Sequence, residues 1–332
     1  MLNESITTRA SGIPPGALAK LAGETGGNRR QPVGDSVFAG FAKAAAFTIL
    51  IALAGVAIFL TVKGMPAFSA TESDLDGQSS LLIYVAKLAY GTTLAALLAL
   101  LIATPLALAV ALAVSHYAPG RLASPIGYAI DLLAAIPSVI FGLWGAFTLG
   151  KYLTPLYEWL AASSLTNWLP LFHGPASGSG RTILTAAVVL AIMILPIITA
   201  ISREIFSQTP RLHQEAALAL GATRWEMVRL VVFPHARSGI VSAAMLGLGR
   251  AMGETMAVAM VLSTQGGLFS LNLISADNPS TIAANIALRF PEAFGTKVNV
   301  LIFSGLALFA ISFAVNFLAR LILTRAGERR AS

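Results

Sequence analysis

The stretch YGTTLAALLALLIATPLALAVALAV, residues Tyr90–Val114, contains no charged side chain. A helix needs about 20 apolar residues to cross the hydrocarbon core of a bilayer, and this stretch is longer than that. The whole chain has the same character, since 56% of its 332 residues are hydrophobic and 11% are charged. A typical soluble domain carries about 25% charged residues, so the composition excludes an ordinary soluble fold and predicts a membrane protein.

Six such stretches occur along the chain, and helices are expected because their backbone hydrogen bonds close within each segment. They are Val37–Val62, Tyr90–Val114, Ile126–Gly150, Thr182–Phe206, Ser238–Ser263 and Val298–Leu323. The predicted fold class is therefore all-α, a polytopic membrane protein with six transmembrane helices. Pro105, Pro137 and Pro196 fall inside the second, third and fourth spans. Each is expected to kink its helix, and a role in packing is favoured over a direct functional role.

The segments outside the spans divide the chain. Residues 1–36 are rich in Gly, Pro, Ser and Thr and lack an apolar pattern, which predicts a disordered cytoplasmic tail and not a signal peptide. Residues 37–325 form the predicted transmembrane domain, and residues 326–332 form a C-terminal tail. The segment Leu153–Phe172 is fairly apolar and carries two tryptophans, so it is interpreted as an interfacial segment on the outer face.

The basic residues predict the orientation. The basic residues in or next to the N-terminal tail, the loop at Arg121, the loop between the fourth and fifth spans and the end of the last span number 15, against 6 on the other side. Because cytoplasmic loops carry an excess of Lys and Arg, both termini are expected in the cytoplasm, in a multi-pass protein of the plasma membrane. The net charge of +7 then follows from topology, and nucleic acid is not an expected partner.

Several kinds of chemistry find no support. The chain has no cysteine, which excludes disulfides and thiolate metal sites, and its 4 histidines lack metal-ligand spacing. It has no Gly-rich phosphate loop ending in Gly-Lys-Ser/Thr, and its loops are too short for a soluble catalytic domain. The chain is therefore not expected to be an enzyme or to hold a cofactor, and ATP would be used by another chain.

The loop at residues 207–237 contains the sequence PRLHQEAALALGATRWEMVRLVVFP from Pro210 to Pro234. Pro210 is suited to begin a helix and Gly221 to end it, and the alanines between them favour helix with little bulk. The pattern predicts a short helix, then Gly221, then a second helical stretch that is broken before Pro234. A short helix held out from the membrane can fit a groove on a partner protein.

This loop resembles the EAA loop of binding-protein-dependent ABC importers. The family pattern is Glu-Ala-Ala, three residues, Gly, nine residues, and Ile-x-Leu-Pro. Its residues here are Glu215, Ala216, Ala217, Gly221 and Pro234, with Val231 and Phe233 in place of Ile and Leu. An ordinary Ala-rich connecting helix is the alternative for Glu-Ala-Ala alone, but not for the full pattern between two spans. The resemblance implies a type I importer permease in which this helix couples to an ATPase. It also implies that Glu215 and Gly221 set the shape of the helix and that Ala216 and Ala217 contact the ATPase.

Two charged residues lie inside the predicted fifth span, in the sequence GLGRAMGETMAV. Arg250 is about a dozen residues from the cytoplasmic end, or roughly 18 Å, which places it near the bilayer centre. Glu254 follows four positions later, so the two side chains are expected to share one helix face and to pair. One interpretation is an ion pair that fixes helix packing. The other is a pathway-lining site in which Arg250 attracts an anion and Glu254 orients or gates it, because guanidinium binds phosphate-like oxygens in bidentate fashion.

The amino-acid sequence of this segment resembles that of the membrane subunits of phosphate-specific (Pst) importers. The run from Arg250 to Val258, which includes Thr255, is similar to the C-type (PstC-like) subunit more than to its A-type partner. The sequences IPSVIFGLWG from Ile136 and ILPIIT from Ile194 are similar to that subunit as well. In that family the positions of Arg250 and Glu254 are implicated in phosphate passage, and both roles are carried over. Asp131 lies in the third span, and two roles are open for it. It either contributes to packing near the cytoplasmic interface, which is the favoured role, or faces the pathway.

The resemblance implies a permease subunit of an ATP-driven phosphate importer in the bacterial inner membrane. Its expected partners are a related second permease (PstA-like), a cytoplasmic ATPase dimer (PstB-like), an extracytoplasmic phosphate-binding protein (PstS-like), inorganic phosphate and membrane lipid. Two alternatives stay open at this point. One is an importer for another oxyanion, such as sulfate or molybdate, which Arg250 alone does not exclude. The other is a channel or secondary carrier that works without an ATPase.

Overall fold

The computed structural model describes residues 33–163, 166, 168–262 and 269–328. Within them, five helices are long and apolar enough to cross a membrane: Val37–Ser69, Leu81–Tyr117, Ile183–Ser207, Arg224–Gly253 and Thr296–Leu321. They become six if the bent helix pair Gly120–Ala134 and Ser138–Ala162 forms one broken span. These segments correspond to the six predicted spans and confirm the all-α membrane fold. The third predicted span is the one whose form differs.

The first span is helix α2 (Val33–Gly64), which passes into a short 3-10 turn at Met65–Ser69. Because α2 begins at Val33, the last residues of the predicted N-terminal tail are helical, while residues 1–32 of that tail lie outside the described part of the chain. Likewise, helix α13 (Thr296–Glu328) extends into the predicted C-terminal tail, of which residues 329–332 are not described. The described residues divide into two units, residues 33–56 and residues 57–328.

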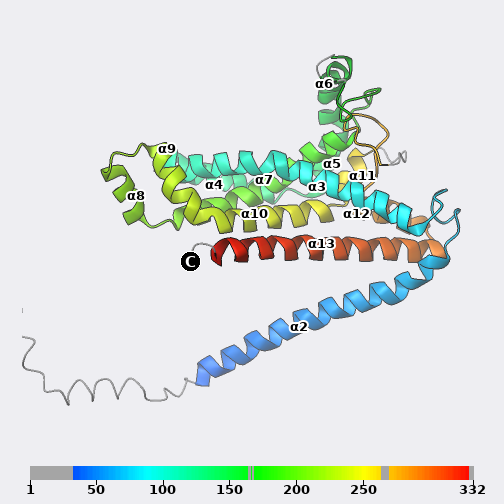
Figure 1. The fold of residues 1–332 in the computed structure, drawn as a ribbon, viewed down its shortest axis with the longest axis horizontal. Helices are drawn as coiled ribbons and strands as arrows, with labels where there is room; N and C mark the ends of the chain where they lie inside the picture. Colours follow the sequence, from blue (N-terminus) through cyan, green and yellow to red (C-terminus); the bar gives the residue numbers. More distant parts are fainter. Residues whose placement is uncertain (1–32, 164–165, 167, 263–268, 329–332) are drawn as a thin grey trace, which may run out of the picture. The chain divides into compact units, whose positions relative to one another are not determined.

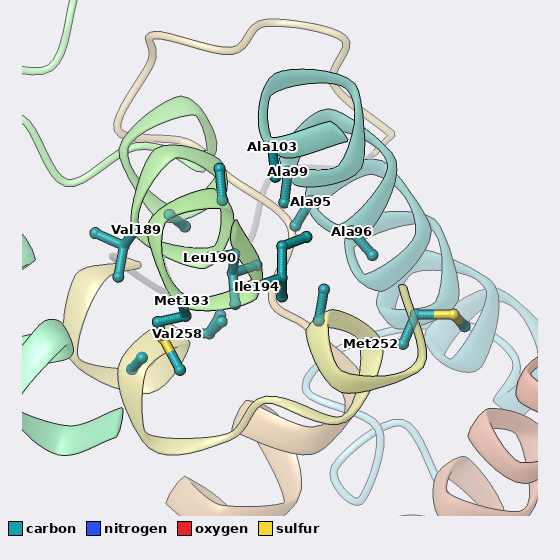
Figure 2. Close-up of a cluster of buried hydrophobic side chains, with 14 of the residues drawn as sticks. Ala95, Ala96, Ala99, Ala103, Val189, Leu190, Met193, Ile194, Met252 and Val258 are labelled. Carbon is teal, nitrogen blue, oxygen red and sulfur yellow. The ribbon is translucent and has the colours of Figure 1, made fainter. Parts of the chain in front are cut away.

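The core of the larger unit lies between α3 (Leu81–Leu112) and α7 (Ile183–Ser207). Ala95, Ala99, Ala103 and Ala107 repeat every four residues along α3 and are fully buried. Figure 2 shows three of these alanines across from Leu190 and Ile194 of α7. Small side chains let two helix backbones approach closely, which is the usual basis of helix association in membranes. Neither Pro105 in α3 nor Pro196 in α7 interrupts its helix.

The third predicted span is broken at residues 135–137. Helix α4 (Gly120–Ala134) ends there, and α5 (Ser138–Trp144) begins a second helix that continues through a π turn (Gly145–Leu149) into α6 (Gly150–Ala162). The two halves are bent by 87°. The expectation of a kinked but continuous span is therefore wrong here. The cause is Pro137, whose ring disfavours helical geometry at the preceding residue and whose own backbone is extended (φ −58°, ψ 137°).

The loop after α7 contains helix α8 (Arg211–Ala219) and the first turn α9 (Arg224–Met227) of the next long helix. This long helix continues through a π turn (Val228–Val232) into α10 (Phe233–Gly253), so the predicted break before Pro234 does not occur. In the π turn, Phe233 N donates to Val228 O, five residues back. The wider turn accommodates a proline ring that would otherwise collide with a carbonyl of the preceding turn.

The fifth predicted span ends early, because α10 stops at Gly253 and a separate short helix α11 (Met256–Val261) follows. Two further elements precede α13: α12 (Ile282–Arg289) and the 3-10 turn Phe290–Glu292. In Figure 1, α8 lies at one end of the α3–α7–α10 bundle, while α6, α11 and α12 lie towards the other end. The predicted interfacial segment Leu153–Phe172 begins inside α6, and Trp159 and Trp168 are exposed as expected.

Candidate functional site

Arg250 lies in the last turn of α10, close to the middle of the bundle. The depth follows from Gly247, one turn earlier, whose Cα faces Ile194 and Ile198 near the centre of α7. The Arg250 side chain is exposed on the surface of the isolated chain. A charge on a lipid-facing surface at that depth costs about 2.5–3.5 kcal/mol on insertion scales. The face that carries Arg250 is therefore expected to meet protein or water in the membrane, and not lipid.

Glu254 is not the i+4 neighbour of Arg250 on one continuous helix. It follows the end of α10 with extended backbone (φ −69°, ψ 128°), and its Oε1 accepts a hydrogen bond of 3.3 Å from Ala257 N in the first turn of α11. Within the described residues, no ion pair joins Arg250 to Glu254. The expectation of a shared face and an ion pair is wrong, because Glu254 caps the next helix.

Thr255 lies in the same break and is half-buried. Its hydroxyl donates to Gly253 O at 3.2 Å, so it satisfies a carbonyl that the end of α10 leaves without a helical partner. Glu254 and Thr255 thus lie in an interruption of the helix, and Arg250 lies just before it, in the last turn of α10. The break exposes backbone polar groups at a depth where backbone is normally satisfied within a helix, which is tolerated where it lines a cavity or is covered by protein.

A second interruption packs close to the first. Gly142 lies one turn into α5, and a Cβ added there would be 2.8 Å from Ala257 Cα at the start of α11. One turn later, a Cβ on Gly145 would be 2.6 Å from Val189 Cγ2 and 2.9 Å from Val261 Cγ2. The two short helices therefore cross at glycines, and the break before α5 lies near the break before α11. Sequence reasoning missed this crossing, although Gly142 and Gly145 belong to the IPSVIFGLWG segment.

Asp131 is not brought into this group by any contact. It is exposed on α4, three residues before the helix ends, and among the described residues it makes no hydrogen bond or ion pair. On the same helix, one turn earlier, Gly127 is buried against the Arg203 guanidinium of α7. Gly127 thus forms a close contact between α4 and α7, and both the packing role and the pathway role of Asp131 stay predictions.

The predicted coupling helix is α8, which buries none of its side chains. Gly221 ends it with a positive φ of 89°, a conformation that L-residues rarely adopt. Gly221 N donates to Leu218 O at 3.0 Å, and Ala222 N donates to Ala217 O at 3.1 Å. This pair of bonds is a Schellman motif, so the predicted helix end at Gly221 is confirmed.

The next helix starts only two residues later, with a capping box. Thr223 Oγ1 accepts from Glu226 N at 3.3 Å, and Glu226 Oε2 accepts from Thr223 N at 2.8 Å. The two caps together fix the angle between α8 and the long helix that leads to Arg250. Sequence reasoning did not use this capping box, although the Thr-x-x-Glu spacing was visible.

The coupling loop presents apolar side chains to solvent. Leu212 is 74% exposed, Leu220 90% and Trp225 57%. Ala216 and Glu215 also lie on the exposed side, whereas Ala217 is half-buried against the cluster formed by Phe206, Met227 and Val228 with their neighbours. Leu220, Trp225 and the exposed side of α8 thus form an apolar surface that the isolated chain leaves uncovered. Ala217 contacts the bundle with its half-buried side chain, and its predicted role in coupling stays a prediction.

The chain is similar to known membrane transport proteins. A family model described as "Binding-protein-dependent transport system inner membrane component" matches residues 103–328. PstC 2, a phosphate transport system permease protein of Mycobacterium tuberculosis, is 45% identical over 304 residues, which cover 87% of this chain and 91% of that protein. PstC of Mesorhizobium japonicum is 38% identical over 312 residues, which cover 91% of this chain and 93% of that protein.

A solved structure supports the fold independently. It is a bacterial ABC transporter involved in the import of the acidic polysaccharide alginate, with a TM-score of 0.58 and 15% identity, and the match covers 88% of this chain and 96% of that one. At this identity the likeness concerns the fold alone, and it agrees with the predicted permease arrangement. On the family match and on the two relatives, this chain belongs to the binding-protein-dependent transport system inner membrane components.

Proposed function

We propose that this chain is the permease subunit of an ATP-driven phosphate importer in the bacterial inner membrane, and that it forms half of the translocation pathway. The substrate class rests on relatives that are phosphate transport system permeases and that match over nearly their whole length. The observation that carries the site is Arg250, a guanidinium near the middle of the bundle with no carboxylate partner among the described residues.

Arg250 suits an oxyanion for two reasons. A guanidinium keeps its charge when it is dehydrated, and its two parallel N–H groups match two oxygens of a phosphate-like anion. An arginine that was already paired with Glu254 would be neutralised, and an incoming anion would have to displace the carboxylate. Since Glu254 is instead directed to Ala257 N, the positive charge of Arg250 stays available. Glu254 and Thr255 then contribute polar groups at the break beside it.

The partners follow from the family and from the two ends of the bundle. A second, related permease (PstA-like) would complete the pathway against the face that carries Arg250. Two copies of an ATPase (PstB-like) would dock on the coupling loops of the two permeases, and here Leu212, Leu220 and Trp225 provide the exposed apolar surface. A phosphate-binding protein (PstS-like) would deliver the anion at the end opposite α8. In this arrangement both termini are cytoplasmic, and ATP is used by the partner while this chain holds no cofactor.

Transport would proceed by alternating access. ATP binding closes the ATPase pair and moves α8. The caps at Gly221 and Thr223 transmit this motion into the long helix that ends at Gly253, so Arg250 in its last turn and the break at Glu254 move with the coupling loop. Asp131 is a secondary candidate for the pathway, on the strength of its exposure alone.

The test is uptake by the complete assembly in proteoliposomes, with labelled phosphate, sulfate and molybdate offered in parallel. We expect ATP-dependent phosphate uptake, which Arg250→Gln abolishes while the assembly still purifies intact. Arg320→Gln is the matched control, because it removes an exposed arginine from another span. Molybdate uptake without phosphate uptake would contradict the substrate, and uptake without the ATPase would contradict the transporter class. Loss of assembly in Arg250→Gln would favour a packing role for Arg250.

A further inference from the structure

The break at Glu254 and Thr255 is held in place by a helix that is itself very short. Helix α11 has 6 residues, and after it Leu262 returns to extended backbone (φ −76°, ψ 137°). So short a helix is not stable by itself, since isolated helices need roughly 12–15 residues to be even marginal in water. Its orientation must therefore be set by contacts. Along one side, α11 contacts the glycines of the α5 segment, Gly142 and Gly145. At its first turn, it is hydrogen-bonded to Glu254.

At the other end of α11 the contact is Arg181, which lies just before α7. Arg181 Nη2 donates to Met260 O at 2.9 Å and to Leu262 O at 3.3 Å. The last carbonyls of a helix lack intrahelical partners and carry partial negative charge, so a guanidinium there both satisfies them and complements the helix dipole. Arg181 thus holds the C-terminal end of the same helix whose first turn binds Glu254.

Arg181 is itself anchored from two directions. Asn278, which is fully buried, donates from Nδ2 to Arg181 O at 3.3 Å and accepts from Ile183 N at Oδ1 at 3.2 Å. The loop that precedes α12 therefore fixes the backbone of Arg181 to the start of α7. Ser177 N and Leu184 N add bonds to Ile274 O and Leu273 O at 2.8 and 3.1 Å. Through Arg181, the loops at the end opposite α8 are connected to the break.

We propose that Arg181 is a positioning residue for the Glu254–Thr255 break, and that it acts through the last-turn carbonyls of α11. The effect that we infer on phosphate uptake rests on the proposed function, whereas the effect on the position of α11 does not. Without the guanidinium, the carbonyls of Met260 and Leu262 lose charged donors, and α11 can pivot about its crossing with Gly142. Because α11 is only about 9 Å long, a tilt that frees its last turn also displaces its first turn, where Glu254 is bound.

The experiment uses the absence of cysteine from the chain. Met256, the first residue of α11, is exposed and is replaced by cysteine as a reporter in the purified assembly in lipid nanodiscs. The rate of labelling by a small maleimide is measured with Arg181, Arg181→Gln and Arg181→Lys. A second reporter, Tyr152→Cys on α6, tests for general loosening. Arg289→Gln is the matched control, because it removes another guanidinium, one that is bound to Asp76 and not to α11.

We expect Arg181→Gln to change the labelling rate at position 256 by about tenfold, and Arg181→Lys to change that rate less. Tenfold is the scale expected for the loss of a charge-assisted hydrogen bond. Tyr152→Cys should label at the same rate in every variant, and Arg289→Gln should leave position 256 unchanged. An unchanged rate at position 256 in Arg181→Gln would overturn the proposal. So would an equal change at both reporters, since that outcome means loss of fold and not of position.

Phosphate uptake gives the second readout. A positioning residue that does not touch the anion should lower the maximal rate of uptake by about tenfold in Arg181→Gln and leave KM within about twofold, with partial recovery in Arg181→Lys. A raised KM with an unchanged maximal rate would contradict this role and indicate direct contact with the anion. If the unmodified assembly transports no phosphate, the proposed function fails, whereas the labelling result still decides the role of Arg181.

Discussion

Replacing Gly221 by residues with a side chain tests the coupling loop at one backbone angle. Gly221 has a φ of 89°, and a Cβ added there would meet nothing within 4 Å, so any effect comes from backbone strain and not from crowding. The left-handed conformation costs an L-residue roughly 1–2 kcal/mol, which lowers the population of the closed helix end about 5- to 30-fold. Asparagine tolerates this conformation better than alanine. The expected order of function is therefore Gly, Asn, Ala and then Val.

The assay is phosphate uptake per ATP hydrolysed by the reconstituted assembly, together with the affinity of the ATPase for the permease pair. Strain at Gly221 should reduce the number of phosphates moved per ATP, because the Schellman motif no longer fixes α8 to the next helix. Gly55→Ala is the control, since Gly55 is helical and a Cβ added there would also meet nothing within 4 Å. Full coupling in Gly221→Val, or equal losses in the asparagine and alanine variants, would refute this reasoning.

Three further changes test the site and its supports. Gly142→Val should destabilise the crossing with Ala257 by about 1–3 kcal/mol and lower both the melting temperature and uptake; an unchanged melting temperature would contradict the close approach. Thr223→Ala removes the capping box with Glu226 and should cost about 0.5–2 kcal/mol, measured by thermal unfolding of the assembly, with a smaller loss expected for Thr223→Ser. Arg250→Lys should retain part of the phosphate uptake, because charge remains while bidentate geometry is lost; uptake no better than in Arg250→Gln would show that charge alone does not suffice.

The sequence predicted the spans well because hydrophobic length is a direct physical requirement of the bilayer. The same reasoning could not predict which prolines break a helix. Pro105 and Pro196 stay inside α3 and α7, whereas Pro137 begins a new helix at 87°. The helices also differ in packing, since α3 and α7 share a cluster of buried alanines, leucines and isoleucines to which α4 contributes only the half-buried Leu133. Whether a helix continues through a proline therefore depends on tertiary packing, which a local sequence pattern does not specify.

The candidate site shows the same limit. The roles of Arg250, Glu254 and Thr255 stay predictions, and the expected pairing of Arg250 with Glu254 assumed a helix that continues. Gly253 and Glu254 instead end it, and the carboxylate binds the next helix. In the coupling loop, by contrast, the predicted end at Gly221 is confirmed, because a glycine in a left-handed turn is a local requirement. The glycine rule transferred from sequence to structure at Gly221, whereas the expected side-chain partner of Glu254 across the break did not.

The alanine-lined contact between α3 and α7 has a mechanical consequence. Alanine has no side-chain rotamers to rearrange, so two helices joined through such residues have little freedom to slide or re-pack. We expect the pair to move as one unit, and α7 connects through residues 208–210 to α8 at one end and to the Arg181 loop at the other. A force applied by the ATPase at α8 would then reach the far end of α7, about 37 Å away, with little loss. Deformation would concentrate where the backbone is already interrupted, at the two joints before α5 and α11.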